Sequence, residues 1–171
     1  AVYHVQIPPA AKKIRELAYA SFFVADHATH FYVLGGPDFV VGLQAPKAER
    51  NILGLVKTVG REIGAQVMQL LKENHEVSAI IGGRYIHPVG ALVGGVSKPL
   101  TAAERERLIE IGKNSVKAAQ FSLKLFTDVV LKNNAYKDML LSQAYRHETY
   151  YMGMVDVDNK VNFYDGVVRV V

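Results

Sequence analysis

Cysteine is absent from this sequence of 171 residues, and so is tryptophan. Without a thiol the chain can form no disulfide, no thiolate-bound zinc or iron-sulfur site and no cysteine nucleophile, because each of these chemistries requires the sulfur atom. Long apolar runs are also missing, and none approaches the roughly 18 residues of a membrane span. The N-terminus lacks the charged, apolar and small-residue order of a secretory signal. We therefore expect no membrane span and a cytoplasmic location.

An excess of charge of one sign is missing as well. The chain has 20 basic and 16 acidic residues, a formal net charge of +4, and these residues are spread along the sequence. This distribution does not indicate a nucleic-acid partner. Half of the residues are hydrophobic and 21% are charged. A chain of this length and composition can bury a core of its own, so we expect a single domain over residues 1–171.

Apolar spacing predicts two helices in the first half of the chain. The first begins at Pro8 and Pro9, which suit a helix N-terminus, and is expected to stop at about Leu34, before Gly35-Gly36-Pro37. The second is expected from about residue 46 or 47. Its apolar residues recur three, four or seven positions apart, which places them on one face: Ile52, Val56, Val59, Ile63 and Leu70.

Glycine and proline are frequent between Val77 and Leu100, which favours short strands or an extended loop there. Thr101 and Glu104 have the spacing of a capping box and predict the start of a third helix. Along that helix small residues occupy most of a stripe, which favours the close approach of another helix: Leu108, Gly112, Ser115, Ala119, Ser122 and Phe126. From Tyr150 to Val171 an apolar strand pattern with turn residues at Asn159 and at Asp165-Gly166 predicts a hairpin.

The predicted fold class is mainly α with a small β part. It consists of a bundle of three long helices, a Gly-rich loop between the second and third helices, and a C-terminal antiparallel hairpin.

Two clusters of polar residues are candidates for a functional site. His27 and His30 lie three positions apart on the first helix, and this spacing can place both imidazoles on one face. Two ligands are too few for a metal site, and a hydrogen-bonded structural pair is the more common role. Arg84 and His87 lie in the glycine-rich stretch from Gly82 to Gly95, where they can donate hydrogen bonds or pass protons. A structural turn with a solvated arginine explains that stretch equally well.

Other charged residues carry no functional prediction. Arg105, Glu106 and Arg107 are expected on a solvated face of the third helix, and Glu62 and Glu76 have no evident partner.

Three motifs resemble nickel-iron hydrogenase large subunits. The stretch Ala25–Phe39 contains the His-x-x-His-Phe-Tyr pattern of that family, followed by Pro-Asp. The stretch Gly82–Val96 is similar to the family's His-Pro loop that ends in Gly-Gly-Val. Glu148–Gly153 together with Asn162–Gly166 resembles the cytosolic multisubunit branch, which includes viologen-reducing, deazaflavin-linked and NAD(P)-linked enzymes. The resemblance spans nearly the whole chain.

The resemblance implies reversible oxidation of molecular hydrogen at a nickel-iron centre. In the family this centre is held by four cysteines in two Cys-x-x-Cys elements, one near each end of the large subunit. This sequence has neither element, so the resemblance implies an internal fragment, the central region of a larger subunit. The isolated chain is expected to bind no cofactor or metal and to be inactive. The implied partners are the remainder of the large subunit, an iron-sulfur small subunit and further electron-transfer subunits.

On this resemblance, His27, His30, Arg84 and His87 are expected beside the centre or along the proton and gas paths, and none of them is a metal ligand. Two alternatives remain. One is a non-catalytic scaffold or interaction module of the same descent. The other is a hydrogenase-like subunit of a quinone-reducing complex, although the amino-acid sequences of the motifs fit hydrogenases better.

Overall fold

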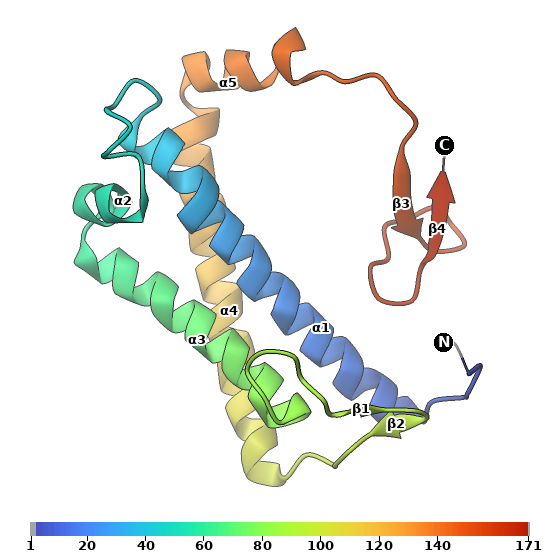
Figure 1. The fold of residues 1–171 in the computed structure, drawn as a ribbon. Helices are drawn as coiled ribbons and strands as arrows, with labels where there is room; N and C mark the ends of the chain where they lie inside the picture. Colours follow the sequence, from blue (N-terminus) through green and yellow to red (C-terminus); the bar gives the residue numbers. More distant parts are fainter. Residues whose placement is uncertain (1–2, 171) are drawn as a thin grey trace. The chain divides into compact units, whose positions relative to one another are not determined.

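A computed structural model describes residues 3–170, except for the side chain of Tyr145 (Figure 1). Val171, at the end of the expected last strand, lies outside the described residues. The chain divides into two compact units, residues 1–133 and residues 134–171, and each is described by itself. The single domain over residues 1–171 stays a prediction.

Helix α1 (Pro9–Thr29) follows Pro8, and Pro9 occupies its first position as predicted. The predicted end at about Leu34 is wrong, because the chain continues through the π-helical segments η1 (His30–Gly35) and η2 (Pro37–Val41). Gly36 keeps right-handed helical dihedrals, with φ −54° and ψ −44°. A π turn is wider than an α turn and accommodates the proline ring and its missing N–H. The Gly35-Gly36-Pro37 stretch therefore does not end the helical backbone. The segment ends at Gly42, whose φ is 109°.

The predicted second helix is two helices, α2 (Ile52–Val59) and α3 (Arg61–Gly82). It starts later than expected because the side-chain oxygen of Asn51 accepts the N–H groups of Leu53 and Gly54 as an N-cap. Gly60 separates the two helices with φ 94° and ψ 154°, a conformation that is essentially restricted to glycine. The extended structure predicted from Val77 is wrong up to Gly82, where α3 ends.

A loop over residues 83–90 leads to a short hairpin of β1 (Ala91–Leu92) and β2 (Gly95–Val96), which pair antiparallel. Helix α4 (Ala102–Phe126) then begins at the predicted capping box of Thr101 and Glu104, and it continues into the π-helical segment η3 (Thr127–Leu131). Of the predicted small-residue stripe, Leu108 and Ser115 are buried while Gly112 and Ala119 are exposed. Ile111, outside the stripe, is the most buried residue of this helix.

The core of the first unit consists of two apolar clusters. The first cluster joins α3 and α4 through Val77, Ile81, Leu108 and Ile111, and Ile14 and Ala18 of α1 pack against it. The second cluster joins the other end of α1 to α3 through Ala28, Tyr32 and Leu70. Helices α1 and α3 thus run antiparallel, with α4 along the same bundle (Figure 1).

The second unit consists of α5 (Asn134–Leu140), a 3-10 turn η4 (Gln143–Tyr145) and a hairpin of β3 (Met152–Val155) and β4 (Val167–Val170). The predicted turn at Asn159 lies inside the long connection between the two strands, where Asn159 has φ 64°. The carboxylate of Asp156 orders this connection by accepting the N–H groups of Asp158 and Lys160. The C-terminal hairpin is therefore confirmed, with β3 beginning at Met152, two residues after the predicted start at Tyr150.

The fold class is confirmed: mainly α, with three long helices (α1, α3 and α4), the glycine-rich loop and small antiparallel hairpins. Within residues 3–170 no helix combines the length and the apolar character that crossing a lipid bilayer requires.

Candidate functional site

His27 and His30 lie at the end of α1 and at the start of η1, and both side chains are exposed. Nδ1 of His27 lies 2.9 Å from the carbonyl oxygen of Phe23. Because a carbonyl oxygen only accepts, Nδ1 carries the proton, and Nε2 of the neutral ring is left as an acceptor. The imidazole also stacks on the ring of Phe23, with centroids 5.2 Å apart. The ring of His27 is therefore held in one orientation with its basic nitrogen available.

An open apolar groove of about 590 Å³ runs beside this histidine pair, between α1 and α4. Its lining includes His27, His30 and Phe31 from α1 and η1. Leu123 and Phe126 line it from α4. Phe31 and Phe126 approach across the groove in an edge-on arrangement, with centroids 6.3 Å apart. The two imidazoles thus border apolar surface that is open in the part of the chain the structure describes.

The motif that contains the histidine pair is anchored by two of its other residues. Tyr32 is buried, and its hydroxyl lies 2.7 Å from Oγ of Ser122 on α4. The hydroxyl of Ser122 donates to the carbonyl oxygen of Ala118, so Tyr32 is the donor to Ser122. Burial raises the pKa of Tyr32 and keeps the phenol protonated. Further along, Asp38 accepts a hydrogen bond from Nη1 of Arg50 at 2.9 Å.

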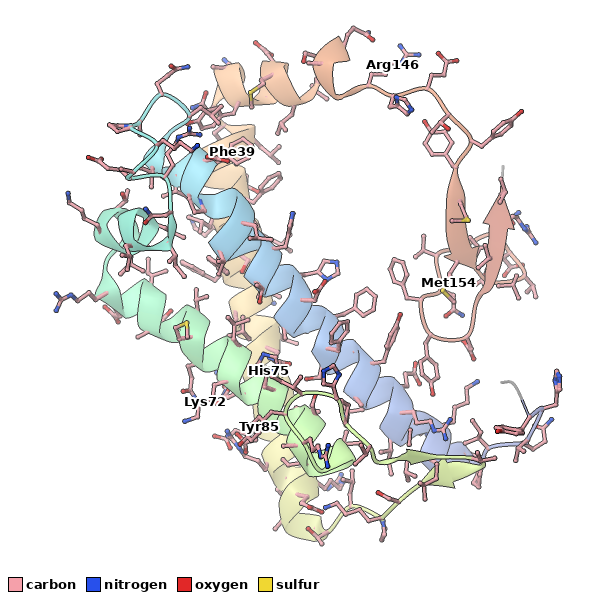
Figure 2. The ribbon with its side chains drawn as sticks, in the orientation of Figure 1. Phe39, Lys72, His75, Tyr85, Arg146 and Met154 are labelled. Carbon is pink, nitrogen blue, oxygen red and sulfur yellow. The ribbon has the colours of Figure 1, made fainter. Side chains whose placement is uncertain are left out.

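Arg84 and His87 lie on the loop that follows α3, and their side chains are exposed. The base of this loop is closed by the N–H of Val89, which donates to the carbonyl oxygen of Gly82. A Cβ at Gly82 would lie 2.2 Å from Cβ of Pro88, so glycine is required for this approach. His87 has φ 53°, an uncommon left-handed conformation for a residue with a side chain. The closed base presents residues 83–89 outward, including Tyr85 (Figure 2).

Arg15 joins this region to α1, and the sequence reasoning missed it. Its Nε donates to the carbonyl oxygen of Gly95 at 3.1 Å, and its Nη2 donates to the carbonyl oxygens of Leu92 and Gly95. Both strands of the β1–β2 hairpin are therefore bonded to one guanidinium. Nothing in the sequence signals this role, because the acceptors are backbone atoms about 80 positions away.

The two predicted pairs of site residues lie at opposite ends of the bundle. The core cluster near Ile81 packs on Ile14 and Ala18, whereas Leu70 packs with Ala28 and Tyr32. From Leu70 to the end of α3 at Gly82, a rise of 1.5 Å per residue corresponds to about 18 Å. The structure therefore does not bring Arg84 and His87 together with His27 and His30.

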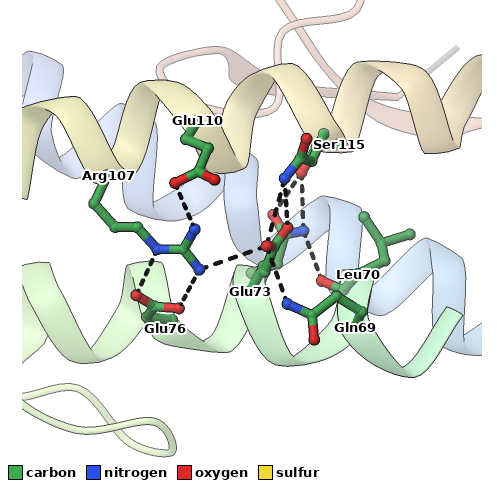
Figure 3. Close-up of polar contacts among 9 residues, drawn as sticks. Gln69, Leu70, Glu73, Glu76, Arg107, Glu110 and Ser115 are labelled. Carbon is green, nitrogen blue, oxygen red and sulfur yellow. Dashed lines mark hydrogen bonds and ion pairs between the residues drawn. The ribbon is translucent and has the colours of Figure 1, made fainter. Parts of the chain in front are cut away.

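A buried polar network connects the three long helices near their midpoint. The hydroxyl of Ser21 on α1 donates to the backbone and side-chain oxygens of Asn74 on α3. The amide nitrogen of Asn74 donates to Oγ of Ser115 on α4 at 3.0 Å and to the carbonyl oxygen of Leu70. All three side chains are buried. Figure 3 shows the part of this network between α3 and α4.

Arg107 is not on a solvated face, and the prediction that Glu76 has no evident partner is also wrong. Nε and Nη2 of Arg107 donate to the two carboxylate oxygens of Glu76 at 2.9 and 2.8 Å, and Nη1 donates to Glu110 (Figure 3). The hydrogen bonds from the Arg107 guanidinium lower the pKa of the Glu76 carboxyl group. Beside it the buried carboxylate of Glu73 accepts from Gln69 and Asn114. Helical spacing in the sequence predicts which face of a helix each of these residues occupies. It does not predict which face of α3 contacts which face of α4.

The residues of this chain do not fit a thiolate-bound metal centre, because the sequence has no cysteine. Among residues 3–170 no three His, Asp or Glu side chains gather in a group that could hold a metal ion. The described site consists of two exposed imidazoles that border apolar surface.

The comparisons with known proteins agree on one family. Residues 1–62 match the family described as nickel-dependent hydrogenase. The chain is 42% identical over 165 residues to the iron-sulfur subunit of the F420-non-reducing hydrogenase of Archaeoglobus profundus, which covers 96% of this chain and 34% of that protein. It is 31% identical to the beta subunit of the NAD-reducing hydrogenase HoxS of Cupriavidus necator, covering 98% of this chain and 34% of that protein.

A solved structure agrees with these sequence matches. The crystal structure of an NAD+-reducing [NiFe]-hydrogenase in the H2-reduced state matches with a TM-score of 0.84 and 28% identity, covering 96% of this chain and 36% of that chain. The chain belongs to the nickel-dependent hydrogenase family. It spans about a third of the length of the curated relatives it matches, which are subunits of multisubunit hydrogenases.

Proposed function

We propose that this chain is part of the catalytic large subunit of a nickel-iron hydrogenase, which oxidises molecular hydrogen reversibly. The observation that supports this most is the similarity in fold over 96% of the chain to an NAD+-reducing [NiFe]-hydrogenase. Within the subunit this chain supplies scaffold and polar neighbours of the metals, and it is inactive alone.

The nickel-iron centre of the parent subunit is held by residues outside this chain. Its ligands in the proposed enzyme are the thiolates of two Cys-x-x-Cys elements, which this sequence lacks. When bound, the centre supplies the chemistry that splits the hydrogen molecule. The present residues contribute hydrogen bonding and proton transfer around it.

Of the four proposed site residues, His27 has the clearest chemical role. Its Nδ1–H is directed to the carbonyl oxygen of Phe23, so Nε2 is the nitrogen that can accept a proton. His30 borders the same groove. Arg84 and His87 follow the opposite end of α3, whose stretch from Leu70 to Gly82 corresponds to about 18 Å, and they form a second exposed polar group. The two groups therefore act at different points of the proton or gas path, and at most one of them lies against the metals.

The proposed partners follow from the class of enzyme. They are the remainder of the large subunit, an iron-sulfur small subunit that carries electrons away, and further electron-transfer subunits. The relatives are named as NAD-reducing and F420-non-reducing hydrogenases. We propose that this protein has a comparable cytoplasmic assembly, with no nucleic-acid partner.

The first test is the coding sequence on both sides of these residues, followed by an assay. We expect the reading frame to continue into a Cys-x-x-Cys element on each side, and the purified complex to reduce a viologen dye with hydrogen. A frame bounded by start and stop codons at these residues would overturn the catalytic proposal. A non-catalytic interaction module would then be the better interpretation.

The second test separates the two polar groups within the full-length enzyme. His27→Gln, His30→Gln and His87→Gln are compared with His75→Gln, an exposed histidine of α3 to which no role is assigned (Figure 2). Loss of a proton-path residue should slow steady-state hydrogen oxidation and shift its pH profile, while metal content stays unchanged. Variants that all behave like His75→Gln would remove these residues from the site.

A further inference from the structure

An apolar cavity of about 160 Å³ lies among the π-helical segments of the first unit. Its walls come from η1, η2, α2 and η3, with single contributions from neighbouring turns of α3 and α4, so they belong to residues 30–130 alone. Segment η2 contacts both η1 and η3. A π-helical backbone is rare in proteins and occurs frequently at functional sites. The cavity therefore lies at the junction of three unusual segments that the described residues form.

Two glycines keep the space open on the side of η1. Gly35 and Gly36 line the cavity with backbone atoms alone. A Cβ at position 36 would lie 2.9 Å from the carbonyl oxygen of Phe31 and 3.4 Å from Cδ2 of Leu55. A side chain at this position would collide with the backbone and enter the space beside Leu55, so glycine is required there. This wall of the cavity consequently has no side chain that could fill it.

The surface of the cavity is almost entirely carbon. Tyr32 contributes its ring, while its hydroxyl is directed to Ser122. A water molecule inside such a surface finds too few hydrogen-bond partners to be held. A protein cavity of about 150 Å³ with a lining of Leu, Ile and Phe stays dry and binds benzene. The present cavity has a similar volume and the same lining chemistry.

We propose that this cavity is a binding site for one neutral hydrocarbon molecule of about the size of a six-membered ring. Polar and charged molecules are excluded, because the carbon surface does not replace the hydrogen bonds that they lose on leaving water. The bound molecule contacts the rings of Phe31 and Phe126, which also line the groove beside His27 and His30. The site thus adjoins the histidine pair without using it, and the proposal does not depend on the proposed function.

The test follows the fluorine NMR line of fluorobenzene, which broadens when the molecule binds a protein. The unaltered full-length protein is compared with two variants, Val129→Phe and Val116→Phe. Val129 lines the cavity, so a phenylalanine there takes up the space of the ligand, whereas Val116 is 58% exposed on α4 and serves as the matched control. We expect saturable binding to the unaltered protein and to Val116→Phe, and at least about tenfold weaker binding to Val129→Phe. Benzene should displace the probe, and phenol at the same concentration should not.

A second measurement needs no substitution. Crystals of the full-length protein soaked with bromobenzene should show the anomalous signal of bromine among η1, η2 and η3. Binding of fluorobenzene to Val129→Phe as tight as to the unaltered protein, or bromine located only elsewhere, would overturn the proposal. So would a lack of saturable binding, or equal displacement by phenol. Hydrogen oxidation enters neither readout, so this proposal can fail while the proposed function holds.

Discussion

Arg15 and Gly95 lie 80 positions apart in the sequence, yet Nε of Arg15 donates to the carbonyl oxygen of Gly95 at 3.1 Å. The same guanidinium reaches Leu92 on the other strand of the β1–β2 hairpin. This contact ties the glycine-rich stretch to α1. It connects the loop that carries Arg84 and His87 to the rigid part of the bundle.

Arg15→Ala should loosen the hairpin without unfolding the helices. Loss of charge-assisted hydrogen bonds from a half-buried arginine is expected to lower the free energy of unfolding by about 1–2 kcal/mol. Amide hydrogen exchange over residues 84–97 should become faster, while exchange in α3 is unchanged. Lys13→Ala, exposed on the same helix, is the control. Unchanged exchange over residues 84–97 would show that Arg15 does not hold the hairpin.

Two glycines should respond to alanine in opposite directions. Gly60 has φ 94° and ψ 154°, so Gly60→Ala is expected to cost about 1–3 kcal/mol of stability in backbone strain. Gly112 lies inside α4, and a Cβ there would have no neighbour within 4 Å. Gly112→Ala is therefore expected to stabilise the chain by about 0.5–1 kcal/mol. Urea unfolding of both variants checks the prediction, and shifts of the same sign would contradict it.

Asn74→Asp should destabilise the bundle strongly although the side chains have the same shape. A carboxylate cannot donate to Ser115 or to the carbonyl oxygen of Leu70, so two buried hydrogen bonds are lost. We expect a loss of about 2–3 kcal/mol at pH 7. Burial raises the pKa of an introduced aspartate, so the loss should be smaller near pH 4, where protonation restores a donor.

The control for Asn74→Asp is Gln120→Glu on the exposed side of α4. It makes the same amide-to-carboxylate change in solvent and should leave the free energy of unfolding nearly unchanged. Equal effects of the two substitutions at pH 7 would mean that the buried network contributes nothing to stability.

The Arg107–Glu76 pair should make stability depend on acid pH. Arg107 lowers the pKa of Glu76 below its ordinary value of 4.5. The stabilisation is therefore fully present above pH 4.5 and is lost as the pH falls through the lowered folded pKa. Glu76→Gln should reduce the free energy of unfolding by about 0.5–1 kcal/mol at pH 7. The difference from the unaltered chain should shrink on acidification.

Chemical unfolding between pH 7 and pH 3 measures this difference for Glu76→Gln and for the exposed control Glu16→Gln. A constant difference over that range would exclude a stabilising role for ionised Glu76. The control makes the same carboxylate-to-amide change at an exposed position of α1.

The errors in the predicted helix boundaries have local causes. Glycine permits a turn without imposing one, so the helix expected to stop at Gly35 and Gly36 in fact continues as a π winding. Gly60 resembles an ordinary helical position in the sequence, yet it has the positive φ that divides α2 from α3. Apolar spacing is unaffected by this break, since it reports which residues face a core and not whether the backbone is continuous.

The sequence by itself determined the helical class, the capping box at Thr101, the C-terminal hairpin and the absence of thiolate chemistry, because these depend on local spacing and on residue type. It also carried the family motifs around His27 and His87. Only the tertiary structure decided that these motifs lie apart, that Arg107 meets Glu76, and that Asn74 joins three helices. The physical reason is that a periodic pattern defines a face, whereas the partner of that face comes from residues distant in the chain and is selected by packing and by the need to pair buried polar groups.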